Sequence, residues 1–309
     1  NIGYIYDSGE DIPEDNKEAV KWYKLAAEEG LGAAQYTLAR MYDFGEGVEE
    51  DKEQAVKWYR KAALQDIAPS QYMLGYMYDH GLGIEEDNIE AVKWYRNAAN
   101  QGFVPAKFSL AWMYDSGQGV LKNNREAYKW YLMAAEEGYV PAEYNLGLLH
   151  DSRKSLNKNR METLKWHHKA AEHGFAKAQF SIGWKYDTGE GVPEDNSEAI
   201  KWYSKAADQG FIPAQFNLGV LYIHGESGIQ FDLKKAINWF YKAAEFGDAR
   251  SQFIIGTMYE NGEGFSQDYF PAYYWYNLSA YQGEVADMKS KELIAEKLPH
   301  WQIATAQKL

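Results

Sequence analysis

Residues 31–66 read LGAAQYTLARMYDFGEGVEEDKEQAVKWYRKAALQD, and the order of their apolar and turn residues predicts two helices joined by a short loop. In the first half, Ala34, Leu38 and Met41 recur at the spacing of one helix face. This helix is expected to end at Gly45, because glycine readily adopts the left-handed conformation that closes a helix. We call the first helix of such a unit helix A.

The second half of this segment carries the signals of another helix, helix B. Asp51 is a good N-cap residue, and Gln54 three positions later completes a pair of the capping-box type. Ala55, Trp58 and Ala62 then form the apolar side of helix B, with charged residues on the opposite side. The same capping signal recurs along the chain as Asp15/Glu18, Asp87/Glu90, Asn123/Glu126, Asn159/Glu162 and Asp195/Glu198.

Tryptophans mark an internal repeat with a period of 36 residues, lengthened once by one residue. They are Trp22, Trp58, Trp94, Trp130, Trp166, Trp202, Trp239 and Trp275. Each is followed directly by another aromatic or histidine side chain and, four residues on, by a pair of small residues. Because several columns keep one register over eight copies, each copy is expected to be a two-helix unit that packs only on its neighbours.

We therefore predict an all-α solenoid of about eight helix-turn-helix repeats that forms a single domain over residues 1–309. The expected units are a truncated repeat at 1–30, repeats at 31–66, 67–102, 103–138, 139–174, 175–210, 211–247 and 248–283, and C-terminal capping helices at 284–309. Asn1-Ile2-Gly3 aligns with Asn217-Leu218-Gly219, so the chain is expected to begin inside a helix A and to be a fragment of a longer protein.

Two motifs in one repeat carry a specific signature. Residues Ala178 to Val192 fit A-x-x-x-[LI]-G-x-x-Y-x-x-G-x-G-V, and Ala199 to Gly210 fit A-x-x-W-Y-x-x-A-A-x-x-G. On these motifs the chain resembles, over residues 1–283, the Sel1-like repeat family, relatives of tetratricopeptide repeats. The resemblance implies a right-handed superhelical solenoid that serves as a non-enzymatic scaffold or adaptor for partner proteins. Bacterial members that it resembles often mediate host-cell interaction, so analogy favours a secreted, periplasmic or host-facing location over a cytoplasmic one.

The composition narrows the classes of function. Among 309 residues, 32 Lys and Arg stand against 45 Asp and Glu, a formal net charge of -13, which argues against nucleic acid as a partner. No apolar run approaches the roughly 20 residues that span a bilayer, so membrane insertion is not expected. The sequence has no cysteine and no phosphate-binding, zinc-protease or serine-hydrolase motif. We therefore expect that the chain is not an enzyme and that it binds no cofactor and no metal.

Candidate partner-binding residues lie on helix A, on the side opposite its buried residues. In related two-helix solenoids helix A lines the concave surface, so this side is the expected binding face. The predicted partner-binding residues are Arg40, Tyr76, Trp112 and Trp184 in one column and Asp43, Asp79, Asp115, Asp151 and Asp187 in another. An acidic face with aromatic rings suits a protein or peptide with basic residues. A third column, through Tyr36, is expected to pack between repeats.

Other interpretations remain open at this point. The Asp column alone is equally well explained as a solvated face that aids solubility, and the Trp column tips the balance toward binding. An enzyme such as a hydrolase acting within the superhelix would instead require a pocket of close-set ionisable groups. The fourth repeat carries a basic loop at residues 153–160 and four histidines, His150, His167, His168 and His173. A tolerated surface variation is the simplest explanation, and a second docking point, a pairing site for another copy of the chain or a zinc site are the alternatives.

Overall fold

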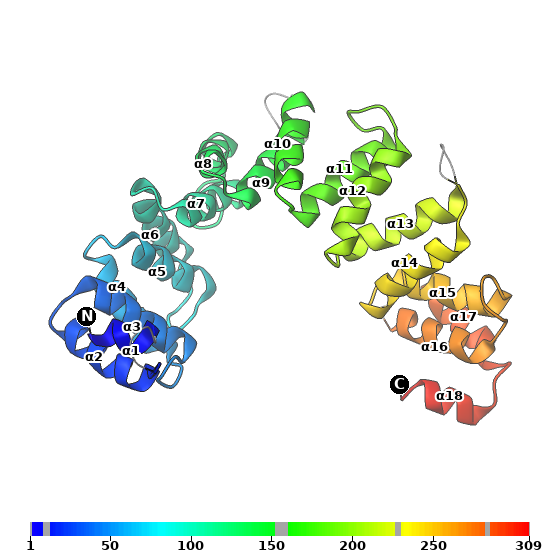
Figure 1. Ribbon diagram of the computed structural model, residues 1–309, viewed down its shortest axis with the longest axis horizontal. Helices are drawn as coiled ribbons and strands as arrows, with labels where there is room; N and C mark the ends of the chain where they lie inside the picture. Colours follow the sequence, from blue (N-terminus) through cyan, green and yellow to red (C-terminus); the bar gives the residue numbers. More distant parts are fainter. Residues whose placement is uncertain (1, 9–12, 152–159, 226–229, 282–284, 309) are drawn as a thin grey trace. The chain divides into compact units, whose positions relative to one another are not determined.

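The computed structural model describes residues 2–8, 13–151, 160–225, 230–281 and 285–308, which form helices and connecting loops and contain no strand. Contacts between residues divide the chain into two compact units, residues 1–158 and residues 159–309. Figure 1 shows that in each unit the helices follow one another in chain order. The predicted all-α repeat architecture is confirmed.

In the unit of residues 1–158 each helix packs against the one before and the one after it through α9. Its helices are α1 (Ile2–Ser8), α2 (Asn16–Glu28), α3 (Gly32–Phe44), α4 (Lys52–Ala63), α5 (Ala68–His80), α6 (Asn88–Asn100), α7 (Val104–Ser116), α8 (Asn124–Glu136) and α9 (Val140–Asp151). The odd-numbered helices are the A helices of the repeats, and the even-numbered ones are the B helices.

In the unit of residues 159–309 the same alternation continues and ends in two further helices that pack on α16. Its helices are α10 (Arg160–Glu172), α11 (Ala176–Thr188), α12 (Asn196–Asp208), α13 (Ile212–His224), α14 (Leu233–Glu245), α15 (Ala249–Asn261), α16 (Tyr269–Ala280), α17 (Val285–Ala295) and α18 (His300–Ala306). The last helix is also joined to α16 by the Gln307 side chain, which donates a hydrogen bond to the Tyr273 hydroxyl at 3.0 Å.

The helix boundaries follow the local signals in the sequence. The Asp51 carboxylate accepts a hydrogen bond from the Gln54 backbone N–H at 2.9 Å, so it caps α4 as predicted. Helix α3 ends at Gly45 with φ 71°, the expected left-handed closure. The predicted pair Asn159/Glu162 lies outside the described residues, because Asn159 is not among them.

A second glycine in the loops after α3, α5 and α7 joins neighbouring repeats in the unit of residues 1–158. At Gly119, φ is 63° and a Cβ atom would lie 2.0 Å from the backbone oxygen of Asn88, at the start of the preceding helix B. Both the backbone angle and the contact therefore require glycine. The loops after α3, α5 and α7 consequently rest directly on the first turn of the previous helix B.

Aromatic rings fill the space within and between repeats. Tyr72 on α5 lies 5.7 Å from the ring of Tyr95 in its own repeat and 5.4 Å from Phe103 at the start of the next. The same double contact joins Phe108 to Tyr131 and Tyr139. The column through Tyr36 thus packs between repeats, as expected from the sequence. These rings hold consecutive A helices at a fixed register.

Polar pairs thirty residues apart join the start of helix A to the end of helix B within one repeat. The amide of Gln65 donates to Gln35 at 2.8 Å, and that of Gln101 donates to Gln71 at 2.7 Å. Within the third repeat an ion pair replaces the two amides, because buried Lys107 bonds to Glu137 at 2.5 Å. Removing Glu137 would leave the buried Lys107 ammonium without its partner, which costs more free energy than losing one of two amides.

Candidate functional site

One column of helix A residues is exposed in consecutive repeats. We call it the helix-A stripe; in the unit of residues 1–158 it consists of Tyr4, Arg40, Tyr76, Trp112 and Leu148. The exposed fractions of its four uncharged members run from 37% to 50%, whereas Leu38 and Met41 on the other side of α3 are buried. In the second unit Trp184 occupies the same position on α11 and is exposed to the same degree as Trp112.

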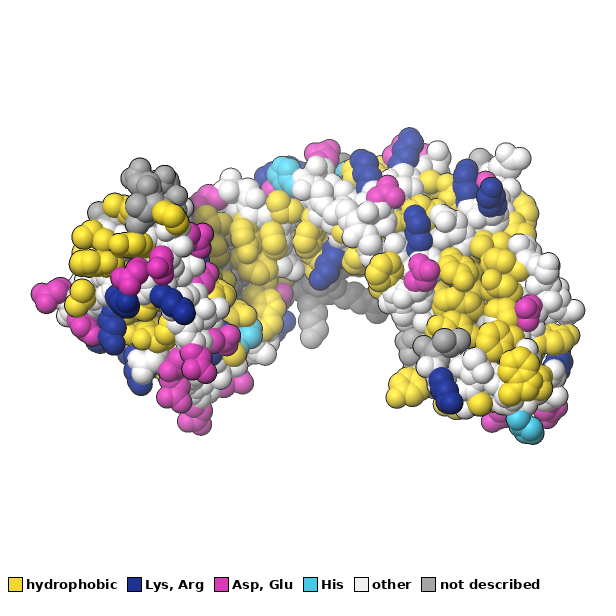
Figure 2. Space-filling view, turned by 60° about the horizontal axis from the view of Figure 1, so that its bottom comes forward, with side chains coloured by type: hydrophobic (Ala, Val, Ile, Leu, Met, Phe, Trp, Pro, Cys, Tyr) yellow, Lys and Arg dark blue, Asp and Glu magenta, His cyan; other side chains and the backbone are white. Residues whose placement is uncertain are grey.

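The stripe is continuous between the second and third repeats. The Tyr72 ring on α5 lies 5.4 Å from the ring of Phe103, the N-cap residue of α7, so these two A helices are neighbours. Tyr76 and Trp112 occupy equivalent positions of α5 and α7, so the two exposed rings project from the same side of neighbouring helices. Figure 2 shows hydrophobic side chains reaching the surface among charged ones in both units. Large rings at a surface are typical of protein-binding sites.

The acidic column has a structural partner that the sequence analysis missed. In each of five repeats its carboxylate accepts a hydrogen bond from the hydroxyl of the tyrosine that follows the repeat's Trp, sixteen residues on. The pairs are Asp7–Tyr23 at 3.3 Å, Asp43–Tyr59 at 3.2 Å, Asp79–Tyr95 at 3.1 Å, Asp187–Tyr203 at 3.0 Å and Glu260–Tyr276 at 2.8 Å. We call this contact the acid–tyrosine clasp. It joins helix A to helix B of the same repeat.

The sixth repeat, at residues 211–247, shows that the acid and the hydroxyl belong together. There Ile223 replaces the acid and Phe240 replaces the tyrosine, so both polar groups are lost at once. A buried carboxylate without its donor is costly, whereas removing both partners is nearly neutral. This paired change is a signal in the sequence from which the clasp could have been found.

The acids differ in how far a partner could reach them. The Asp43 side chain is only 6% exposed and also bonds to the Lys52 ammonium at 2.9 Å, so burial takes it out of the accessible surface. The Asp79 side chain is 11% exposed, and Asp115 is 36% exposed. The side chain of Asp151 lies outside the described residues. Among the described acids named here, Asp115 is the one most open to a ligand.

Burial governs the ionisation of the clasps. It raises the pKa of Asp79 above its ordinary value, while His80 and the Tyr95 hydrogen bond act in the opposite direction. Burial, and then the neighbouring Asp7 carboxylate, raise the pKa of Tyr23 to about 12. Burial and then Asp79 likewise raise the pKa of Tyr95. The Asp79–Tyr95 clasp therefore pairs a neutral phenol with a partly desolvated acid.

The fourth repeat is described only in part. The basic residues predicted at 153–158 and the side chain of His150 lie outside the described residues. His167 is buried at the position of the clasp tyrosine, and His168 meets the edge of the Trp202 ring at 5.6 Å. Within the part of the chain that the structure describes, no three His, Asp or Glu side chains are grouped as a metal site would require.

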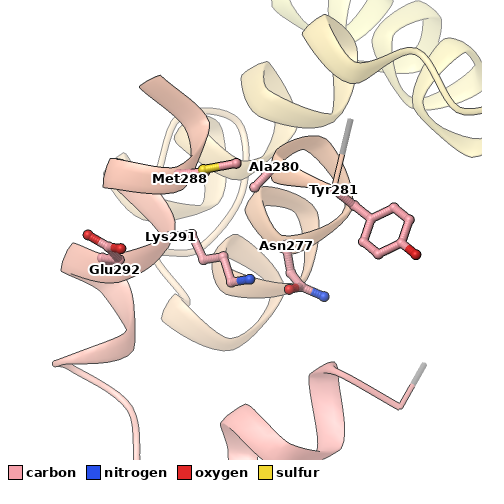
Figure 3. A pocket seen from close by; sticks show the side chains of 6 residues that line it. All are labelled: Asn277, Ala280, Tyr281, Met288, Lys291 and Glu292. Atoms are coloured by element: carbon pink, nitrogen blue, oxygen red, sulfur yellow. The ribbon is translucent and has the colours of Figure 1, made fainter. Parts of the chain in front are cut away.

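Two surface hollows bear on the enzyme alternative. One, of about 420 Å³, lies beside α16 and α17 and is lined by Asn277, Ala280, Tyr281, Met288, Lys291 and Glu292. Figure 3 shows the Tyr281 ring pointing away from it and Glu292 pointing away from Lys291. The other, of about 480 Å³, lies along α14 and has Glu245 as its carboxylate. Each holds a single carboxylate, whereas hydrolysis by acid–base catalysis commonly requires two catalytic groups.

Among the described residues no helix is long and apolar enough to span a bilayer.

Comparison with known proteins identifies the repeats. The Sel1 repeat matches residues 1–31, 32–67, 68–103, 104–139, 140–175, 176–211, 212–248 and 249–284, and each segment after the first begins one residue later than predicted. No curated protein matches the chain.

Solved structures add relatives of known fold. A protective antigen present in uropathogenic Escherichia coli strains, which displays an SLR fold, is 31% identical, with a TM-score of 0.65, over 99% of this chain and 73% of that one. A Sel1 repeat protein from Oxalobacter formigenes is 33% identical, with a TM-score of 0.69, over 78% of this chain and 95% of that one. Yeast Tom70 shares the fold alone. It is 13% identical, with a TM-score of 0.51, over 90% of this chain and 58% of that one.

Proposed function

Since the chain belongs to the Sel1 repeat family, we propose that it is a scaffold that binds a partner protein through the helix-A stripe. Sel1 repeat proteins are generally non-enzymatic protein-interaction scaffolds, which gives the class of function. The observation that carries the choice of surface is the row of exposed rings on consecutive A helices. The apolar sides of these helices are already used for packing between helices A and B, so the stripe is the side left for a partner.

The stripe has the composition of a binding surface. Tyrosine and tryptophan bury a large area with little loss of side-chain freedom, and with arginine they dominate the energetically important contacts of protein interfaces. Tyr76, Trp112 and Arg40 supply all three residue types on neighbouring A helices. A partner segment lying across the A helices would meet one of these side chains at every repeat.

The charge of the surface points to a partner with basic side chains. Asp79 and Asp115 each lie three residues after a ring of the stripe, so they lie on nearly the same side of their helices. The net charge of -13 attracts a basic segment over a longer range. Asp79 and Asp187 accept hydrogen bonds from buried tyrosines, so their contribution comes from charge close to the surface.

We also propose a host-facing bacterial setting. One protein similar to this chain is a protective antigen of uropathogenic Escherichia coli, and a protective antigen is met by the immune system of the host. Recovery of the chain from the culture medium or the periplasm of its source cell would support this setting. Confinement to the cytoplasm would contradict it.

An array of immobilised peptides of varied charge tests the proposed surface. It is probed with the labelled chain, with the double variant Tyr76→Ala/Trp112→Ala, and with Tyr281→Ala, which removes an exposed ring away from the stripe. We expect basic peptides to bind the chain and the Tyr281 variant, and the double variant to lose them while keeping its helical circular dichroism. Equal binding by all three proteins would show that the stripe is not the binding surface.

A further inference from the structure

The third repeat differs from the other described repeats that contain both an acid and a tyrosine, because its clasp is open. The Tyr131 hydroxyl is fully buried and has no hydrogen-bond partner among the described residues. Its counterpart Asp115 bonds instead to the ammonium of Lys122, at 3.4 Å from Oδ1. Lys122 also donates to the backbone oxygen of Asp115, at the end of α7. The Asp115 carboxylate thus bonds to an exposed lysine, and it is more exposed than the carboxylates of Asp43 and Asp79.

We propose that the third repeat is the main docking point for the partner, and that Trp112 and Asp115 there receive an arginine side chain which displaces Lys122. This inference rests on the proposed function and adds the residue class that is recognised. Trp112 and Asp115 are three residues apart on α7, so a ring face and a carboxylate lie side by side at the surface. Arginine fits this pair, because its planar guanidinium stacks on an aromatic ring while its N–H groups donate to a carboxylate.

The contact that the arginine must replace is weak. The Lys122 side chain is more than half exposed, and an exposed ion pair at 3.4 Å contributes little to stability. Lysine is also a point charge without the planar donor geometry of arginine. Lys122 therefore holds the carboxylate at the surface in the free chain and yields it readily to a better donor.

Neighbouring repeats offer less to an arginine. In the second repeat the Tyr76 ring is already covered by His80, which stacks on it at 4.1 Å, and Asp79 is held by Tyr95. Asp43 is buried. Trp112 and Asp115 thus form the place within residues 1–151 where the described ring and acid are both open. The second repeat supplies a flanking contact.

A binding measurement with a defined probe tests this assignment. The probe is a labelled peptide of alternating arginine and alanine, and its affinity for the full chain is read by fluorescence anisotropy at physiological salt. Asp115→Asn is expected to weaken binding about tenfold, as for the loss of one charge-assisted contact. Glu85→Gln is the matched control, since it removes the same charge from an exposed loop residue that is not part of the stripe, and it should change affinity less than about twofold.

Lys122→Gln gives a change of the opposite sign. Gln267 stands at the equivalent position of the last repeat and donates to the Glu260 backbone oxygen at 2.8 Å, so glutamine keeps the helix-end contact without the charge. This variant should bind the probe about threefold more tightly. A peptide of alternating lysine and alanine should bind more weakly than the arginine peptide to every protein tested.

Several results would overturn the assignment. One is equal weakening by Asp115→Asn and Glu85→Gln, which would indicate general charge attraction. The others are weaker binding of the arginine peptide by Lys122→Gln than by the unmodified chain, equal binding of the lysine and arginine peptides, and no binding of the arginine peptide at all. Loss of binding in Tyr76→Ala/Trp112→Ala with no effect of Asp115→Asn would overturn this inference and leave the proposed function standing. Loss of stripe dependence on the peptide array would instead remove the proposed function itself.

Discussion

Replacing Tyr95 by phenylalanine isolates the contribution of one acid–tyrosine clasp. The change removes a hydroxyl that donates to Asp79 at 3.1 Å and leaves a carboxylate whose side chain is 11% exposed without its donor. Hydrogen bonds to charged groups contribute about 1.5–3 kcal/mol, so we expect Tyr95→Phe to lower the free energy of unfolding by about 2 kcal/mol. Urea unfolding followed by circular dichroism measures the shift in midpoint.

The same substitution at Tyr131 is the control, and the structure predicts the opposite sign. The Tyr131 hydroxyl is buried without a hydrogen-bond partner among the described residues. Removing an unsatisfied buried group relieves its desolvation cost, so Tyr131→Phe should be neutral or stabilising by about 1 kcal/mol. Adding Asp79→Ile to Tyr95→Phe copies the Ile223/Phe240 pair and should restore most of the loss. Equal destabilisation by the two Tyr→Phe changes would refute the clasp.

Three further predictions concern the loops and the titration of the clasps. Gly102→Ala should cost roughly 1–2 kcal/mol of left-handed backbone strain alone, since a Cβ atom at Gly102 meets nothing within 4 Å. Gly119→Ala should destabilise the chain by clearly more, because its Cβ atom would also meet the backbone of Asn88. Thermal unfolding of both variants measures the difference, and equal losses would contradict the close loop contact. Because burial raises the pKa of Asp79, the folded state binds its proton more tightly than the unfolded state, and stability from this group falls as pH rises above the ordinary value of 3.8. The free energy of unfolding of Asp79→Asn, measured in urea, should therefore rise relative to that of the unmodified chain as pH increases from about 4 to 7. A difference between the two proteins that does not change with pH would count against the raised pKa of Asp79. Burial also raises the pKa of Tyr203, so the stability of the fold should fall at pH above about 10, where tyrosines of the unfolded chain ionise. The tyrosinate absorbance of Tyr203 should appear together with unfolding rather than before it.

The elements of the fold could be predicted from the sequence because their signals are local. The cap at Asp51 and the closure at Gly45 each act within a few residues of the helix end that they define. A period kept over eight copies then gives the stacking of neighbours. The exposed column through Trp112 also follows from the helical wheel, since the position lies opposite the buried residues of its own helix.

The role of the acidic column could not be read from the helical wheel. A helical wheel gives only the direction of Asp43 from the axis of α3. It does not show that α4, the helix B of the same repeat, packs against α3, near whose end Asp43 lies. The hydroxyl that it meets belongs to Tyr59, sixteen residues away, and this contact is tertiary. Its trace in the sequence is the joint loss of both groups at Ile223 and Phe240. The open clasp of the third repeat left no such trace, because Asp115 and Tyr131 match the pattern of their neighbours.

Fluorine NMR of the chain labelled with 5-fluorotryptophan tests most directly whether the helix-A stripe is the binding surface. Trp112 lies on the stripe, and Trp58 is a buried tryptophan of helix B that serves as the internal reference. Each signal is assigned by a single Trp→Phe change. On titration with the peptide of alternating arginine and alanine, we predict that the Trp112 resonance shifts with a saturating dependence on peptide concentration while the Trp58 resonance stays in place. A titration that moves Trp58 and leaves Trp112 unchanged would contradict it.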